Sequence, residues 1–289
     1  MAKNTKNTEL ALDSNTSSST EEAVYQNKGA IIPQAKFVEE DFEALANEGF
    51  ENADSESYTI PFLSVIQDGS PQTKKTRAEY IPEAEEGMIF NSVSEELFDS
   101  EEGLYIVPVH FDRKYIKWVP RKLGGGFLGE IEVTDPLVDQ GKREGGKLIL
   151  EDGNELADTR KHYVLAVNPE TETFTFALMS LASTQIKKSK QLMSRLNSIK
   201  LKGKKGLFTP PTRANLVHVS TVPESNDQGT WYSWKFNEIR QLDLDNEFES
   251  TLFKVAGEFR DALLKGDLKE QQPDSSTVMQ QEEDDDVGY

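Results

Sequence analysis

The side chains best suited to binding a ligand in this sequence are basic, and they are concentrated in one segment. Between Thr173 and Pro223, 51 residues contain no Asp or Glu. A basic segment of this length without acids favours contact with the phosphates of a polyanion over an ordinary solvated surface. Its nine basic residues are Lys187, Lys188, Lys190, Arg195, Lys200, Lys202, Lys204, Lys205 and Arg213.

A second, smaller group of basic residues lies upstream, where Asp112 is the only acid nearby. This group also favours phosphate contact, although a solvated basic face is the alternative for any short run of lysines. Its members are Arg113, Lys114, Lys117, Arg121 and Lys122.

Aromatic residues accompany both basic groups. Single strands of nucleic acid are held by a basic groove together with rings on which bases stack, each worth about 1–3 kcal/mol. Trp118 lies inside the smaller basic group, and Trp231 and Trp234 follow the longer one. Alternation along a strand places Trp231 and Trp234 on opposite faces, so one of them is expected in the core. Stacking and a place in the core stay open for the remaining candidate rings, Tyr115, Phe127, Phe208 and Tyr232.

Other kinds of chemistry find little support in the sequence. There are no cysteines, and the three histidines lie about 50 residues apart, so a thiol nucleophile and a zinc site of cysteines or clustered histidines are excluded. The glycines 124–126 lack the Lys-Ser/Thr of a P-loop. Acid clusters at 83–86 and 95–96 could hold Mg²⁺ for a nuclease, but a solvated surface is the preferred interpretation. We therefore expect no catalytic residue, no metal and no cofactor.

The charge distribution suggests how the chain is divided. The formal net charge is −19, of which residues 1–60 contribute −8, residues 61–240 contribute −1 and residues 241–289 contribute −10. The acidic excess therefore belongs to the ends, and polar, acidic ends are expected to be disordered. We predict an acidic N-terminal arm (1–57), a β-rich nucleic-acid-binding domain (58–240), an amphipathic C-terminal helix (241–268) and a disordered acidic tail (269–289).

Patterns of β-branched and aromatic residues predict strands throughout the middle of the chain. The first strand is expected at 58–67, and two more at 103–111 and 115–119, separated by a tight turn at 112–114. Strands at 162–168 and 173–179 form a hairpin across the turn PETE, with Phe174 and Phe176 in the core. Strands at 214–222 and 230–237 follow, whereas 130–158 is expected to be a loop or a weak hairpin.

Two helices complete the fold. Residues 180–199 change to a helical period, with Ser183 or Thr184 as the cap and the lysines opposite the apolar face. Residues 245–264 show a clear amphipathic pattern, with Asp245 as the expected cap and Gly266 at the end. A weaker amphipathic pattern covers 39–50. The predicted class is a β-rich α+β fold: an antiparallel OB-like barrel or a curved sheet, with one inserted and one C-terminal helix.

The last residues, EEDDDVGY, are five acids followed by an apolar residue, a glycine and a tyrosine. This tail resembles those of single-stranded DNA-binding proteins of bacteria and phages, which end in Asp-rich runs and a terminal aromatic. The segments WVPRKLGGGF (118–127), STQIKKS (183–189) and WYSW (231–234) also resemble phage early proteins that bind single-stranded DNA. The resemblance implies that Asp284, Asp285, Asp286 and Tyr289 dock on replication or recombination proteins. The short N-terminal OB domain of the bacterial family has no match here in size or position, so its stacking rings are not transferred.

The expected function is therefore sequence-nonspecific binding of single-stranded DNA in phage replication or recombination, without catalysis. The acidic tail would recruit partner proteins and compete with DNA for the basic groove. A virion structural or assembly protein of the scaffold kind is the alternative. No apolar run approaches the ~20 residues that span a bilayer, and no signal-peptide pattern opens the chain, so we expect a cytoplasmic protein without membrane contact. Whether the chain forms a homo-oligomer stays open.

Overall fold

The computed structural model describes residues 45–268, except for 47, 54–56, 145–146 and 228. The acidic tail and most of the acidic arm therefore lie outside the described residues, as does most of the amphipathic pattern at 39–50. The strands are β1 (Phe62–Val65), β2 (Ile89–Asn91), β3 (Leu97–Phe98), β4 (Leu104–Trp118), β5 (Phe127–Glu132), β6 (Lys142–Glu144), β7 (Lys147–Ile149), β8 (Glu155–Asn168), β9 (Thr173–Ala182), β10 (Leu201–Gly203), β11 (Gly206–Phe208), β12 (Asn215–Asn226) and β13 (Gly229–Gln241). The α-helices are α2 (Pro136–Gln140), α3 (Ile186–Ser198) and α4 (Glu247–Lys265), and four 3-10 turns lie at Pro71–Thr73, Arg121–Leu123, Ser183–Gln185 and Thr212–Ala214.

Five long strands form the centre of the fold. The predicted hairpin around PETE is confirmed as β8 and β9, and the predicted strand pair in the 214–237 region is confirmed as β12 and β13. The predicted turn at 112–114 is wrong, because β4 runs without a break through these residues. Residues 112–114 stay extended because each of them pairs with a residue of β8. Asp112 lies opposite Lys161, and Arg113 lies opposite Arg160. The expected loop at 130–158 contains a short helix and short strands, including the β6–β7 hairpin.

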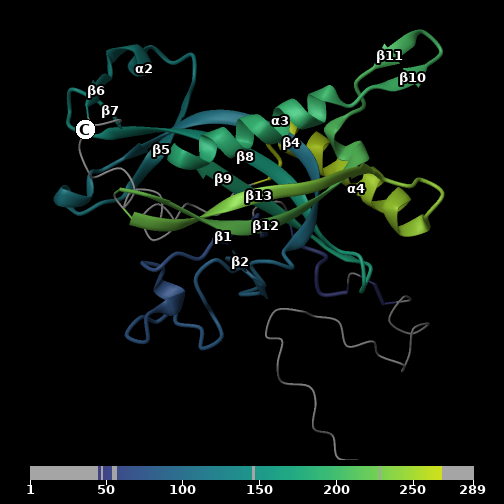
Figure 1. Ribbon diagram of the computed structural model, residues 1–289, viewed down its shortest axis with the longest axis horizontal. Coiled ribbons are helices and arrows are strands. Elements are labelled where there is room, and N and C mark those ends of the chain that lie inside the picture. Colours follow the sequence, from purple (N-terminus) through teal and green to yellow (C-terminus); the bar gives the residue numbers. More distant parts are fainter. Residues whose placement is uncertain (1–44, 47, 54–56, 145–146, 228, 269–289) are drawn as a thin grey trace, which may run out of the picture.

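Most strands join one curled sheet of mixed direction, in the order β13-β12-β4-β8-β9-β1-β2-β3 (Figure 1). The pairing of β1 with β9 is parallel, whereas the other pairs are antiparallel. The curl brings the end of β1 back to β13. There the side-chain amide of Gln67 accepts from the Tyr232 N–H and donates to the Tyr232 carbonyl, each at 2.8 Å. Gln67 thus binds β13 as a neighbouring strand would, and the sheet forms a half-barrel.

Alternation along the strands gives the sheet two buried faces. Ile106 and Val164 lie on the concave face, where Leu192 and Leu196 of α3 complete the core. The neighbouring residues Val107 and Leu165 lie on the opposite face, and there α4 contributes Leu252, Ala256 and Phe259. The C-terminal helix is therefore part of the same core as the strands. Phe174 packs against that core as expected, whereas Phe176 is 41% exposed and contacts the Phe259 ring.

Both predicted helices are present, with small differences at their ends. The Asn246 side chain caps α4 by accepting from the Glu249 N–H at 2.9 Å, in place of the expected Asp245. Gly266 ends the helix with a φ of 77°, in the left-handed region that glycine favours. The expected caps of α3, Ser183 and Thr184, form a 3-10 turn before it, and the helix begins after Gln185 without a side-chain cap.

Candidate nucleic-acid interface

Helix α3 presents its lysines to the surface because its other face is fastened to the sheet. Leu192 and Leu196 are buried in the concave core. Beside them the Ser189 hydroxyl lies 2.7 Å from Nε2 of His162 on β8, and both residues are buried. Burial, with a smaller contribution from the nearby Arg160 charge, lowers the pKa of His162 to about 4. The neutral imidazole therefore helps to hold the helix, and the opposite side of α3 is free for charged residues.

A groove of about 630 Å³ runs between α3 and β13. Its basic lining residues are Lys187, Lys188, Lys190, Arg195 and Lys235. The structure thus brings together the first four basic residues of the acid-free segment. Lys235 was missed because it lies outside that segment. Alternation on β13 could have found it, since Trp234 points into the core and the next side chain must point outward.

Most basic residues of the groove have no carboxylate among the described residues that neutralises their charge. Lys187, Lys190 and Lys235 are exposed, and none of them pairs with a carboxylate within the described part of the chain. Arg195 donates to the backbone carbonyls of Phe236 and Asn237, which ties the end of α3 to β13 and leaves its charge uncompensated. The groove therefore offers several positive charges to an anionic ligand.

One acid, Glu224 of β12, borders this groove. It forms an ion pair with Lys188, and its other oxygen accepts from the Ser233 hydroxyl at 2.7 Å. Burial raises the pKa of the Glu224 carboxyl. The hydrogen bonds from Lys188 and Ser233 outweigh this effect and hold the pKa below its usual value. Glu224 is therefore ionised at neutral pH and cancels the charge of Lys188.

The remaining lysines of the acid-free segment lie on the β10–β11 hairpin, which follows α3 and extends away from the curled sheet (Figure 1). Lys202, Lys204 and Lys205 are exposed there. Lys200, at the base of the hairpin, donates to the Asn197 carbonyl at 2.7 Å and to the Thr209 hydroxyl. The hairpin was not predicted, since no strand was expected between the helix at 180–199 and the strand at 214–222. These four lysines continue the basic surface beyond α3.

Arg213 is the exception in the acid-free segment. It lies in the 3-10 turn before β12, on the α4 side of the molecule, where its guanidinium lies 4.8 Å from the centroid of the Phe253 ring. Gly257 of α4 lies beside the guanidinium, since a Cβ added at Gly257 would lie 3.3 Å from the guanidinium carbon. Arg213 therefore packs against α4 and does not join the groove.

Three of the five residues of the smaller basic group form ion pairs with carboxylates. Arg113 pairs with Asp158 at 2.7 Å, and Lys114 pairs with Asp112 at 3.3 Å and with Glu132. Lys117 pairs with Asp152 at 2.7 Å, and this hydrogen bond, together with those from Asn154, lowers the pKa of Asp152 to about 2. Lys122 is exposed in the 3-10 turn that also contains Arg121. These ion pairs neutralise Arg113, Lys114 and Lys117 without an external anion.

Two of the three tryptophans belong to the core. Trp118 and Trp234 are each 4% exposed, and Trp118 packs edge-on against Phe127 with ring centroids 5.6 Å apart. Trp231 is half-buried, and its indole N–H donates to the Ser233 hydroxyl at 3.0 Å. Neither buried ring is available to stack on a base in this conformation.

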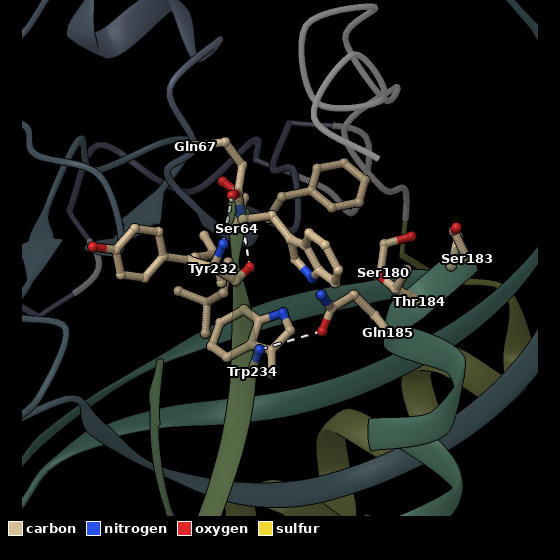
Figure 2. Close-up of a pocket in the computed structure, with 13 residues that line it drawn as sticks. Ser64, Gln67, Ser180, Ser183, Thr184, Gln185, Tyr232 and Trp234 are labelled. Atoms are coloured by element: carbon tan, nitrogen blue, oxygen red, sulfur yellow. Dashed lines mark hydrogen bonds between the residues drawn. The ribbon is translucent and has the colours of Figure 1, made fainter. Parts of the chain in front are cut away.

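Trp231 lines a small hollow between β1, the end of β9 and β13, with Gln67, Tyr232, Trp234 and Gln185 around it (Figure 2). Gln185 donates to the Ser233 hydroxyl at 3.0 Å and accepts from the Trp234 N–H at 3.2 Å. The hollow has about 40 Å³, space for small groups such as water and too little for a nucleobase. The hollow is therefore not a ready-made base pocket, and the hydrogen bonds of Gln67 and Gln185 beside it hold the half-barrel closed.

Two further observations concern the described residues. Within 45–268, outside the gaps named above, no group of three or more His, Asp or Glu side chains gathers to hold a metal ion. In the same part of the chain, no helix combines the length and hydropathy needed to cross a bilayer. The tail residues Asp284, Asp285, Asp286 and Tyr289 lie outside the described residues.

Comparison with known proteins identifies the family. A family model described as Pam3 phage gp34-like protein matches residues 26–269, which is most of the chain. The chain belongs to the Pam3 phage gp34-like family. The family name suggests a bacteriophage protein, in line with the expected origin. No curated protein and no solved structure matches the chain.

Proposed function

We propose that this member of the Pam3 phage gp34-like family binds single-stranded DNA without sequence preference and without catalysis. The observation that carries the proposal is the gathering of lysines in the α3–β13 groove and on the β10–β11 hairpin that follows α3. Apart from Lys188, which pairs with Glu224, none of them has a carboxylate partner among the described residues. Phosphates are the common ligand of such a surface, because each bound phosphate releases counterions. The proposed interface is formed by Lys187, Lys188, Lys190, Arg195, Lys200, Lys202, Lys204, Lys205 and Lys235.

The arrangement of the long strands supports the proposal. The order β13-β12-β4-β8-β9, with α3 inserted between β9 and β12, is compatible with the Greek-key connectivity of an OB-fold barrel. OB-folds commonly bind oligonucleotides. In this chain β1 pairs with β9 where the barrel would otherwise close, and α4 covers the outer face of β4 and β8. The ligand is therefore expected on the α3 side.

The smaller basic group and the two buried tryptophans are left out of the proposed interface. Arg113, Lys114 and Lys117 already have carboxylate partners, and Trp118 and Trp234 lie in the core. We further propose that the acidic tail, with Asp284, Asp285, Asp286 and Tyr289, docks on replication or recombination proteins and competes with DNA for the groove. This part of the proposal rests on the resemblance described above and on charge complementarity with the lysines.

Equilibrium binding to a labelled dT oligomer and to a duplex of the same length tests the proposal. At 50 mM salt we expect nanomolar to micromolar binding of the single strand and weaker binding of the duplex. Absence of binding to the single strand would contradict the proposal and favour a virion structural or assembly protein. Shortening of the oligomer in the presence of Mg²⁺ would contradict the absence of catalysis and indicate a nuclease.

A further inference from the structure

The β10–β11 hairpin is a two-stranded sheet of its own, separate from the curled sheet. It lies beyond the end of α3 and extends into solvent (Figure 1). Lys200 fixes its base through hydrogen bonds to the Asn197 carbonyl and the Thr209 hydroxyl. These hydrogen bonds fix the orientation of the base of the hairpin relative to α3 and its groove.

Two large apolar side chains are exposed on this hairpin, and neither belongs to a hydrophobic core of the described residues. Leu207 is 74% exposed and Phe208 is 47% exposed. They are neighbours on β11, so they lie on opposite faces of the ribbon. Phe208 pairs with Leu201, whereas Leu207 pairs with Lys202. The face of Phe208 therefore also carries Leu201, whereas the face of Leu207 also carries Lys202.

On the same face of the ribbon as Leu201, the Phe208 ring packs against Gly203. A Cβ added to Gly203 would lie 3.1 Å from two carbons of the Phe208 ring. The ring thus covers Gly203 closely, which holds it against the ribbon and leaves its other side to solvent. Glycine at this position in a strand permits such an approach, because a Cβ there would require the ring to shift by a few tenths of an ångström.

The charged side chains of residues 200–208 are all positive. Lys200, Lys202, Lys204 and Lys205 lie on the hairpin or at its base, and none of them pairs with a carboxylate among the residues that the structure describes. A protein partner with an apolar pocket would suit the exposed ring alone. A single strand suits both features, because it has phosphates for the lysines and bases with π-faces for the ring.

We propose that Phe208 is a base-stacking platform, and that the β10–β11 hairpin is an arm that extends the single-strand interface beyond the α3–β13 groove. The inference rests on the proposed function and deepens it by assigning a base contact to one ring. Each stacked base contributes independently of sequence, since every base has a π-face. The lysines of the hairpin bind the phosphates on either side of that base.

Binding of a dT oligomer is compared for the full chain, F208A and L207A, each with a normal oligomer and with one in which the bases are replaced by abasic sites. We expect F208A to weaken binding of the normal oligomer by about 5- to 100-fold. Its salt dependence should stay unchanged, because no charge is lost. L207A, on the other face, should change affinity by less than about twofold. All three proteins should bind the abasic oligomer equally.

A second variant, F208W, keeps an aromatic platform and adds a fluorophore. It should retain the affinity of the unmodified chain, and the added fluorescence should be quenched by the normal oligomer. Unchanged binding by F208A, or an equal loss on normal and abasic oligomers, would overturn the stacking role while leaving the proposed function intact. Failure of the unmodified chain to bind any single strand would overturn both.

Discussion

His162 Nε2 and Ser189 Oγ lie 2.7 Å apart inside the protein, where they join strand β8 to helix α3. The contact matters for function because α3 carries four of the basic residues of the proposed interface. A helix held only by Leu192 and Leu196 would have fewer constraints on its rotation about its own axis. The polar contact therefore helps to keep the lysines turned toward the groove.

This contact makes stability dependent on pH. The pKa of His162 is about 4 in the folded protein, below the usual 6.5, so the folded state favours the neutral ring. Stability from this group is present above pH 6.5 and is lost as the pH falls from 6.5 toward 4. We expect the free energy of unfolding to fall by about 2 kcal/mol between pH 7 and pH 5. Urea unfolding at pH 7 and at pH 5 measures this change in the free energy of unfolding.

The matched control for this prediction is H162Q, which cannot titrate. The variant should be less stable than the unmodified chain at pH 7, because Gln does not reproduce the ring in its pocket. The difference between the two proteins should shrink at pH 5. An equal loss of stability in both proteins between the two pH values would show that His162 is not responsible.

Reversing charges in the groove should weaken DNA binding strongly. K187E/K190E/K235E replaces three exposed lysines that have no carboxylate partner among the described residues. We expect at least a tenfold loss of affinity for a dT oligomer at 50 mM salt, and a salt slope reduced by about 2, since each phosphate contact contributes about 0.7. Fluorescence anisotropy at several salt concentrations measures both quantities.

The control has the same change in net charge at other exposed lysines. K142E/K254E/K265E alters β6 and the middle and the C-terminal end of α4, outside the proposed interface. Its affinity should fall by no more than about threefold, as expected from screened, long-range repulsion. Equal losses in the two triple variants would indicate that only net charge matters and that the groove has no special role.

Removing the charge of Glu224 should tighten binding. The E224Q variant frees Lys188 from its ion pair and removes a negative charge from the edge of the groove. The Gln side chain still offers an acceptor to the Ser233 hydroxyl, so the local structure should persist. We expect an increase in affinity of about threefold or more at 50 mM salt. The same anisotropy assay applies, and weaker binding by E224Q would mean that Glu224 positions a ligand-binding group.

The fold was predictable where neighbouring residues determine it. The alternation of Tyr163, Leu165 and Val167 was enough to predict the strand at 162–168, which is the second half of β8. The apolar period of 245–264 was enough to predict α4. The polar residues 112–114 were misread as a turn because their partners lie in distant segments. Asp158 and Glu132, which neutralise Arg113 and Lys114, are not visible as neighbours in the sequence.

The candidate site was predictable in composition and only partly in geometry. The absence of acids from Thr173 to Pro223 indicated the lysines of α3 and of the hairpin. Lys235 was missed because it comes from another strand and reaches the groove only through the pairing of β13 with β12. Burial of Trp118 and Trp234 depends on the curl of the sheet, which local patterns do not specify.

Deleting residues 280–289 should tighten single-strand binding without reducing stability. The deleted segment contains five consecutive acids, which would compete with DNA for the lysines at a high effective concentration. We expect a gain in affinity that is largest at low salt, measured with the same dT oligomer. A variant of full length with Glu282, Glu283, Asp284, Asp285 and Asp286 changed to their amides should show the same gain. Unchanged or weaker binding in both variants would contradict competition by the tail.

Lysine footprinting tests the location of the interface most directly. The full chain is treated with an acetylating reagent in the presence and absence of a saturating dT oligomer, and the extent of modification at each lysine is measured by mass spectrometry. The account predicts that DNA protects Lys187, Lys190 and Lys235, together with the hairpin lysines 202, 204 and 205, while Lys142, Lys254 and Lys265 react as before. Protection confined to lysines outside the α3–β13 groove and the hairpin, or equal reactivity at every lysine with and without DNA, would contradict it.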